Sequence, residues 1–426
     1  MRGALSAVDA SELVVRALAT PDIERAVQSA AAVDVVAVGK AAGPMLRAAL
    51  SGPVHIPLRH ALGVSAHHPV GQPAGVRWHT ASHPDPDDRS VAAARAVLDV
   101  AGAASDSDLL LLLLSGGASA LMALPAAGVS LEDKQRTCER LLQEGAEIHA
   151  LNTVRKHLSA VKGGQLAAAA GGSVLTLAVS DVVGDDVSVI GSGPSVADAT
   201  TFAAALMQLD RYGGRGDYPE AVVSRLTAGV TGAIPETPQI GDPRLARSDV
   251  RVIGNSRSAV VGASAVAQSL GYVVHVVDEP VVGEARVASR RLVEVASRMA
   301  ETPGAMLCIL AAGETTVRVV GIGKGGRNQE CALAMARGLD ALGNVAAAAS
   351  IGTDGVDGPT DAAGGIVDST TIARAEAAGL GSPERYLDDN NSYVILDELG
   401  DLIRTGPTNT NVGDLQIILV GGSTAG

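Results

Sequence analysis

The sequence predicts an α/β protein of two domains, the first built on a parallel β-sheet with helices on both faces. Short, almost wholly apolar runs such as 109–114 alternate with Ala-rich segments of helical character, as expected of strands buried on both faces. A chain of 426 residues exceeds what one ordinary core accommodates. The segment 229–249 is rich in Pro and Gly and has no periodicity. We therefore expect domains at 1–235 and 236–426.

Three strands are predicted in the first domain. VDVVAVG at 33–39 is the first, and the Ala-rich segment 40–50 is the helix that follows it. DLLLLLLSGG at 108–117 is the second, with a helix over 131–148, and GSVLTLAVSD at 172–181 is the third. Because ligands bind beyond the carboxyl ends of such strands, the loops rich in Gly, Ser and Asp at these ends are the candidate sites.

The second domain repeats the alternation. The segment 250–272 reads as a strand, a polar turn and a helix. Strands, a glycine loop and a helix are expected over 305–339, and 345–368 is a strand that opens into a loop of Gly and Asp. The second domain is therefore also α/β.

Composition excludes several classes of partner. Aromatic residues make up 2% of the chain, with one Trp and one Phe, so platforms for base stacking are nearly ruled out. A net charge of −13 disfavours nucleic acids and anionic membranes. The isolated cysteines Cys138, Cys308 and Cys331 argue against a zinc site or a disulfide framework. Without a signal peptide or a spanning apolar run, we expect a cytoplasmic protein.

Two features at strand ends suit an anionic ligand. Ser115, Gly116, Gly117, Ala118 and Ser119 follow a buried strand, where glycines let backbone N–H groups approach phosphate and serine hydroxyls add donors. A second feature is Lys40, which lies at the end of the first strand and the start of a helix, an unfavourable place for a cation unless an anion sits beside it. A capped turn and a solvated lysine are the structural alternatives.

A cationic segment stands out in this acidic chain. NTVRKHLSAVKGGQLA at 152–167 places Asn152, Arg155 and Lys162 on roughly one face if the whole segment is helical. Arginine offers a two-pronged donor set for carboxylate or phosphate. The alternative is an amphipathic surface helix.

Clustered carboxylates suggest a magnesium site. Asp181 and Asp185 lie in SDVVGDD after the third strand, and Mg²⁺ takes one or two carboxylates together with phosphate oxygens and water. The structural alternative is an ordinary turn rich in Asp and Gly that binds no metal.

A glycine loop in the second half fits two functions. Gly321, Gly323 and Gly326 match GxGxxG, the pattern of a dinucleotide site. Lys324 and Arg327 lie in and beside this loop, and no strand ending in an acid follows at the required distance. A loop that contacts phosphate is therefore favoured over a dinucleotide fingerprint.

Together these motifs resemble the class II glycerate kinases, the glycerate 2-kinase family, whose members have an N-terminal kinase domain and a C-terminal MOFRL domain. The resemblance covers nearly the whole chain, from VGKAAGPM (38–45) to the segment 400–420. The motifs between them are SHPDPDDRS, LLSGGASALM, NTVRKHLSAVKGGQLA, SDVVGDD, SGP, GETTV, GGRNQE and GTDGVDGPTDAAG.

The resemblance implies ATP-dependent phosphorylation of D-glycerate at its 2-hydroxyl with Mg²⁺, a Rossmann-like first domain and an active cleft between the domains. The essential lysine and arginine of the family fall on Lys40 and Arg327. Members have often been labelled hydroxypyruvate reductases. Two departures, Asn391 where the family has Asp and Asn409 where it has Gly, concern substrate preference; Asn409 can adopt a left-handed backbone.

Residue roles follow as expectations. ATP phosphates would lie against Ser115–Ser119 and Arg327, and Mg²⁺ near Asp181 or Asp185. Lys40 would stabilise the transferring phosphoryl group. Asp181 or Asp354 would accept the hydroxyl proton. The resemblance also places three residues of GETTV and GGRNQE beside the nucleotide: Glu314, Gly325 and Gly326.

For the substrate, Arg155 or Lys162 would bind the carboxylate of glycerate, with Asn152 beside them. Two alternatives stay open: an NAD(P)-dependent hydroxypyruvate reductase, and a non-catalytic protein that binds a nucleotide or sugar acid. The partner is a small molecule, and a homodimer is compatible with the sequence.

Overall fold

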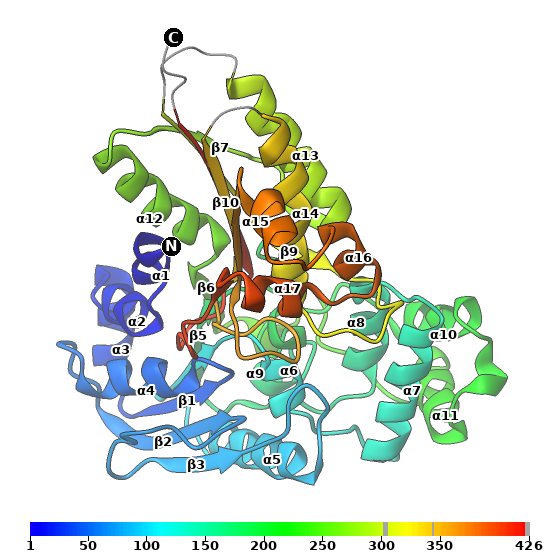
Figure 1. The fold of residues 1–426 in the computed structure, drawn as a ribbon. Helices are drawn as coiled ribbons and strands as arrows, with labels where there is room; N and C mark the ends of the chain where they lie inside the picture. The colour runs from blue at the N-terminus through cyan, green and yellow to red at the C-terminus, as the bar shows by residue number, and fades with distance from the viewer. Residues whose placement is uncertain (301–305, 343–344, 422–426) are drawn as a thin grey trace. The chain divides into compact units, whose positions relative to one another are not determined.

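The computed structural model describes residues 1–300, 306–342 and 345–421, so residue 305 of the predicted 305–339 unit lies outside the described residues. The chain divides into two compact units (Figure 1). One is Ala10–Ile253, and the other joins Met1–Asp9 to Gly254–Gly426. The limit expected from the sequence, residue 235, lies in the largely irregular segment that leads into the last strand of the Ala10–Ile253 unit.

The Ala10–Ile253 unit is built on a six-stranded sheet with the order β3-β2-β1-β4-β5-β6. The pairs β3–β2, β2–β1, β1–β4 and β4–β5 are all parallel. This is the strand order of doubly wound dinucleotide-binding folds, so the predicted α/β class with a parallel sheet is confirmed. The strands are β1 Val33–Val38, β2 Leu58–Ser65, β3 Arg77–Thr80, β4 Leu109–Leu114, β5 Ser173–Val179 and β6 Ser248–Gly254.

Helices lie between most of these strands, whereas β2 and β3 are joined by a segment without a helix, and one helix boundary differs from the prediction. The helix expected over 131–148 ends at Gln143, and Gly145 with φ +78° turns the chain into a second helix that begins at Ile148. The helices are α2 Ala10–Leu18, α3 Pro21–Ser29, α4 Ala42–Ser51, α5 Asp88–Gly102, α6 Ala118–Leu121, α7 Leu131–Gln143, α8 Ile148–His157, α9 Gln165–Ala169, α10 Phe202–Arg211 and α11 Glu220–Val230.

The six leucines of β4 form the centre of this sheet. All are buried, and alternate ones point to opposite faces because side chains alternate along a strand. Leu110, Leu112 and Leu114 belong to one apolar core with Ala93 and Val97 of α5. Burial on both faces holds β4 in place and fixes where its polar carboxyl end emerges.

The other unit has a mixed sheet with the order β12-β11-β10-β13-β9-β7, and β8 pairs with β9. The pairs from β12 to β9 are antiparallel, whereas β7 and β8 run parallel to β9. The strands are β7 Val273–Val276, β8 Val281–Glu284, β9 Leu307–Thr316, β10 Ala346–Gly352, β11 Gly364–Asp368, β12 Leu402–Ile403 and β13 Asp414–Val420.

The first helix of the chain belongs to this second unit and packs against α12, as Figure 1 shows. The two helices approach closely at Gly3 and Gly262: a Cβ on Gly262 would lie 2.4 Å from the carbonyl oxygen of Gly3. The helices are α1 Arg2–Ala7, α12 Ser256–Ser269, α13 Ala285–Ala300, α14 Arg327–Ala341, α15 Thr371–Ala377, α16 Pro383–Asp388 and α17 Ser392–Glu398.

Candidate active site

The loops that follow β1 and β4 touch at the carboxyl edge of the sheet. The N–H of Lys40 donates to the carbonyl of Gly116 at 2.9 Å, and the N–H of Ala41 donates to Oγ of Ser115 at 3.0 Å. Gly39 permits this approach, because its φ is +132° and a Cβ there would lie 2.2 Å from Oγ of Ser115. The order of the strands reverses between β1 and β4, and open α/β sheets bind ligands at that point. We call Lys40 with Ser115–Ser119 the switch-point site.

The side chains of His83 and Lys40 lie close to Gly117, the central glycine of this site. A Cβ on Gly117, which has φ +85°, would lie 3.0 Å from Cδ2 of His83 and 3.5 Å from Cγ of Lys40. Lys40 itself is exposed. The structure thus brings together the lysine and the serine–glycine loop, which the sequence singled out separately. His83, from the SHPDP motif, is a neighbour to which sequence reasoning gave no role.

Ser119 connects the switch-point site to two of the predicted substrate residues. Nζ of Lys162 donates to both the carbonyl oxygen and Oγ of Ser119 at 2.6 Å. Oγ of Ser119 lies 2.9 Å from Oγ of Ser192, which donates to Oδ1 of Asn152 at 3.1 Å. The expected single helical face is wrong, because α8 ends at His157 and Lys162 follows it. Asn152 and Lys162 meet through Ser119 and Ser192 instead.

A third lysine lies in this region. Lys134 of α7 is 4% exposed, and its electrostatic neighbours are Arg155 of α8 and Cys138. Lys162, 1% exposed, interacts electrostatically with both Lys134 and Arg155. We call Lys134, Arg155 and Lys162 the cation cluster. Sequence reasoning missed Lys134, although its helical spacing of three and seven residues from the buried Thr137 and Leu141 places it on the inner face of α7.

The predicted magnesium ligands lie at the carboxyl end of β5. Asp181 and Asp185 are both half-buried, and Asp185 has a left-handed backbone with φ +54°. In the described segments, no group of three or more His, Cys, Asp or Glu side chains is arranged to hold a metal ion. Two carboxylates are nevertheless enough for a Mg²⁺ ion whose other ligands are phosphate oxygens and water.

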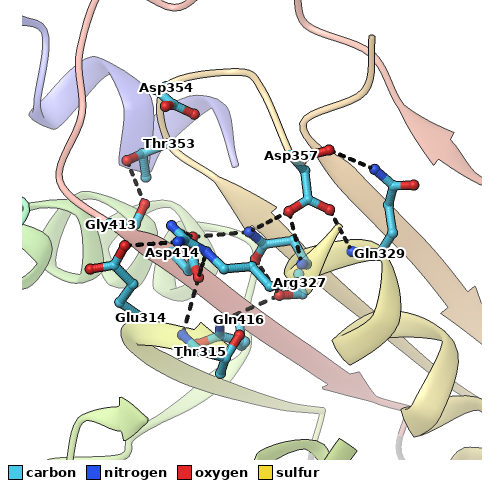
Figure 2. Close-up of polar contacts among 12 residues, drawn as sticks. Glu314, Thr315, Arg327, Gln329, Thr353, Asp354, Asp357, Gly413, Asp414 and Gln416 are labelled. Carbon is cyan, nitrogen blue, oxygen red and sulfur yellow. Dashed lines mark hydrogen bonds and ion pairs between the residues drawn. The ribbon is translucent and has the colours of Figure 1, made fainter. Parts of the chain in front are cut away.

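The second candidate centre surrounds Arg327, the first residue of α14 (Figure 2). Nε of Arg327 lies 2.8 Å from Oδ2 of Asp414, and Nη1 lies 2.7 Å from Oε1 of Glu314. Asp414 at the start of β13 is 1% exposed. Burial raises the pKa of Asp414 to about 6, although the attraction of Arg327 opposes that rise. We call Arg327, Glu314 and Asp414 the Arg327 cluster.

Asp357 caps the helix that carries Arg327. Its carboxylate accepts from the N–H of Asn328 at 3.0 Å and from the N–H of Gln329 at 2.8 Å, as Figure 2 shows for Gln329. A Cβ on Gly326 would lie 2.3 Å from Cγ of Asp357. Two amides at the start of α14 are therefore already occupied by a carboxylate of this chain.

The backbone amides of the GxGxxG segment are occupied as well. The N–H of Gly321 donates to Oδ1 of Asn390, and the N–H of Gly323 donates to the carbonyl of Asp389. Oδ1 of Asn391, one of the two departures from the family pattern, accepts from the N–H of Lys324 at 3.0 Å. The geometry therefore does not present these glycine amides to a pyrophosphate.

Asp354 lies apart from the Arg327 cluster in Figure 2. It follows β10, and its Oδ1 accepts from the N–H of Val356 at 3.1 Å. The carbonyl of Asp354 accepts from the N–H of Thr408. Asn409, which follows Thr408, has φ +60°. The prediction that Asn409 adopts the left-handed conformation usual for glycine is confirmed.

No helix among the described residues is long and apolar enough to cross a membrane.

Comparison with known proteins connects both centres to one family. Residues 1–227 match the model of a domain of unknown function, DUF4147, and residues 307–414 match that of the MOFRL family. The chain is 38% identical over 390 residues to a glycerate 2-kinase of Pyrococcus horikoshii, covering 91% of this chain and 87% of that protein. It is 39% identical over 394 residues to a D-glycerate 2-kinase of Thermotoga maritima, covering 91% and 90%.

This chain belongs to the glycerate kinase family. The crystal structure of glycerate kinase from Thermotoga maritima superposes with a TM-score of 0.81 at 37% identity, and covers 98% of this chain and 99% of that one. The resemblance drawn from the motifs is therefore confirmed along nearly the whole chain, as is the α/β fold with a MOFRL domain.

Proposed function

We propose that this chain transfers the γ-phosphoryl group of ATP to the 2-hydroxyl of D-glycerate, giving 2-phosphoglycerate and ADP. The observation that carries the proposal is the junction of the Lys40 loop with the Ser115–Ser119 loop at the switch point of the sheet. The junction puts a cation and small hydroxyl residues where this fold binds nucleotides and their phosphates.

The proposed roles follow from the charge that each group carries. Lys40 and Arg327 stabilise the negative charge on the transferring phosphoryl group, because phosphoryl transfer depends on fixed cations. Ser115–Ser119 donate to the phosphates of ATP, and Glu314, which pairs with Arg327 at 2.7 Å, lies beside the nucleotide. Gly325 and Gly326 allow the backbone of that region to approach the nucleotide.

Two acidic loops supply the remaining groups. Asp181 and Asp185 would hold the Mg²⁺ that neutralises the phosphates when ATP binds. Asp181 or Asp354 accepts the proton of the 2-hydroxyl as the phosphoryl group arrives. Arg155 binds the carboxylate of glycerate, and Asn152 and Lys162 hold the serine hydroxyls beside it.

A reductase that uses NAD(P) is the second candidate, and the glycine loop gives it little support. The amides of Gly321 and Gly323 are engaged by Asn390 and Asp389, whereas a pyrophosphate would need such amides itself. Loss of nicotinamide absorbance with hydroxypyruvate would favour this candidate.

Product analysis tests the proposal directly. The purified protein is incubated with ATP, Mg²⁺ and D-glycerate, and the products are followed by phosphorus NMR. We expect the signals of 2-phosphoglycerate and ADP. A signal of 3-phosphoglycerate would keep the kinase but overturn the position of transfer. Absence of both from a folded sample would overturn the proposed function.

Replacement of Lys40 tests the switch-point site. We expect Lys40→Ala to lower kcat by at least about 100-fold, because it removes a cation that acts on the transferring charge. The matched control is Arg95→Ala, which removes an exposed cation from α5. Both variants should unfold at the wild-type temperature in circular dichroism. Turnover by Lys40→Ala within about threefold of wild type would refute the role.

A further inference from the structure

The cation cluster has no counter-ion among the residues that the structure describes. Nζ of Lys134 is buried and makes no hydrogen bond within the described chain. Lys162 donates only to the neutral oxygens of Ser119. Arg155 is half-buried and forms no ion pair with any described carboxylate. Three cationic side chains thus lie within electrostatic reach of one another, and two of them are almost fully buried.

Buried like charges without a counter-ion lower the stability of the folded protein, so their presence calls for a functional reason. Burial and the repulsion of Arg155 lower the pKa of Lys134 to about 8, and burial lowers the pKa of Lys162 well below its usual value. The adjacent segment shows the ordinary solution: Lys156, also buried, lies 3.3 Å from Oδ1 of the buried Asp198. A compensating carboxylate beside a buried lysine is therefore available to this fold, and the cation cluster is left without one.

We propose that the carboxylate of the hydroxy-acid substrate completes the cation cluster, and that Lys134 is a positioning residue that makes the site specific for an acid. This inference rests on the proposed function and extends it to a residue outside the recognised motifs. Arg155 contacts the carboxylate, because it is the least buried member and has a two-pronged donor set. Lys134 and Lys162 act behind it by their charge.

The test is the variant Lys134→Met, which is one heavy atom shorter, keeps the unbranched shape of the side chain and removes its charge. We expect the KM for D-glycerate to rise roughly 10- to 100-fold, because the carboxylate loses the attraction of a buried cation behind Arg155. The values of kcat and of the KM for ATP should stay within about twofold. The variant should also melt about 2–6 °C higher, because an uncompensated buried cation is gone. A purely structural role for Lys134 predicts a lower melting temperature instead.

The wild-type pH profile provides a second reading that needs no variant. Lys134 loses its proton as the pH rises through about 8, so the KM for glycerate should increase above that pH. The charged and titratable groups that act on Lys134 are Cys138 of its own helix, Arg155 of α8, and Lys162. In Lys134→Met this increase should be largely absent.

The matched control is Arg136→Met, which removes an exposed cation two residues further along α7 and should leave both KM values unchanged. An unchanged KM for glycerate in Lys134→Met, while wild type forms 2-phosphoglycerate, overturns the inference and leaves the function intact. A rise in the KM for ATP alone would assign the cluster to phosphate and also overturn it. Failure of wild type to phosphorylate glycerate counts against the proposed function itself.

Discussion

Arg327 is held by two carboxylates of unequal surroundings. Glu314 is exposed, whereas Asp414 is buried and also accepts from Nδ2 of Asn328 at 2.9 Å. The exposed ion pair contributes little, because water screens it. The buried Asp414 is therefore the group that fixes the direction of the guanidinium, and its protonation state should matter for the reaction.

The pKa of Asp414, about 6, predicts an acid limb in the pH profile of the kinase. Below pH 6 Asp414 becomes neutral and no longer holds Arg327 by charge, so kcat/KM should fall about tenfold per pH unit. Loss of stability does not explain this fall. Because the pKa of Asp414 is raised in the folded protein, its contribution to stability is full below about pH 4 and decreases as the pH rises toward 6. A profile that stays flat to pH 5, with the fold intact by circular dichroism, would contradict this assignment.

At the scale of elements, Asp357 joins the loop after β10 to the start of α14. Its side chain is 2% exposed and accepts two backbone amides of that helix. Asn328 extends this connection to β10, because its Oδ1 accepts from Oγ of Ser350 at 2.6 Å. The position of Arg327 thus depends on a cap that another loop provides.

Removal of this cap should destabilise the protein. We expect Asp357→Ala to lower the free energy of unfolding by about 1–3 kcal/mol, since two buried amides lose their acceptor. Asp361→Ala is the matched control: its carboxylate, in the same loop, is 63% exposed in its pair with Arg404, and its loss should cost less than about 1 kcal/mol. Thermal and urea unfolding give both values. Equal losses in the two variants would refute the cap as the cause.

The elements that the sequence predicts well are those specified by local pattern. The strand at 33–39 and the leucine strand are read from continuous apolar runs, and Lys40 and Arg327 stand out as cations beside glycine-rich turns. Lys134 was missed because its burial depends on what packs against α7. The mixed strand directions of the second unit's sheet could not be predicted either, because an apolar run does not show whether the neighbouring strand is parallel or antiparallel to it.

At the scale of the whole molecule, the two ends of the sequence share one unit. The hydroxyl of Thr410 donates to the carbonyl of Val8 at 2.6 Å, and α1 lies on α12. The close approach of Gly3 and Gly262 allows this packing. The first nine residues thus contribute to the stability of the unit that contains Arg327.

The glycine at this contact gives a prediction of unusual sign. Gly262→Ala lies within α12, where alanine ordinarily favours a helix by about 1 kcal/mol. Here the added Cβ would lie 2.4 Å from the backbone oxygen of Gly3, so we expect a net loss of about 1–2 kcal/mol in thermal unfolding. Gly102→Ala, at the end of α5 with its nearest neighbour at 3.7 Å, is the control and should be neutral or stabilising. A stabilised Gly262→Ala would show that α1 does not pack there.

The placement of α1 has a consequence for synthesis on the ribosome. The helix is translated before α12, and its binding surface on α12 emerges only after the whole of Ala10–Ile253 has been made. At about 5–20 residues per second, α1 waits roughly 10–50 s for its partner. During that interval Gly3 lacks its close contact with Gly262 of α12. The second unit can therefore be completed only after α12 has been made and packs against α1.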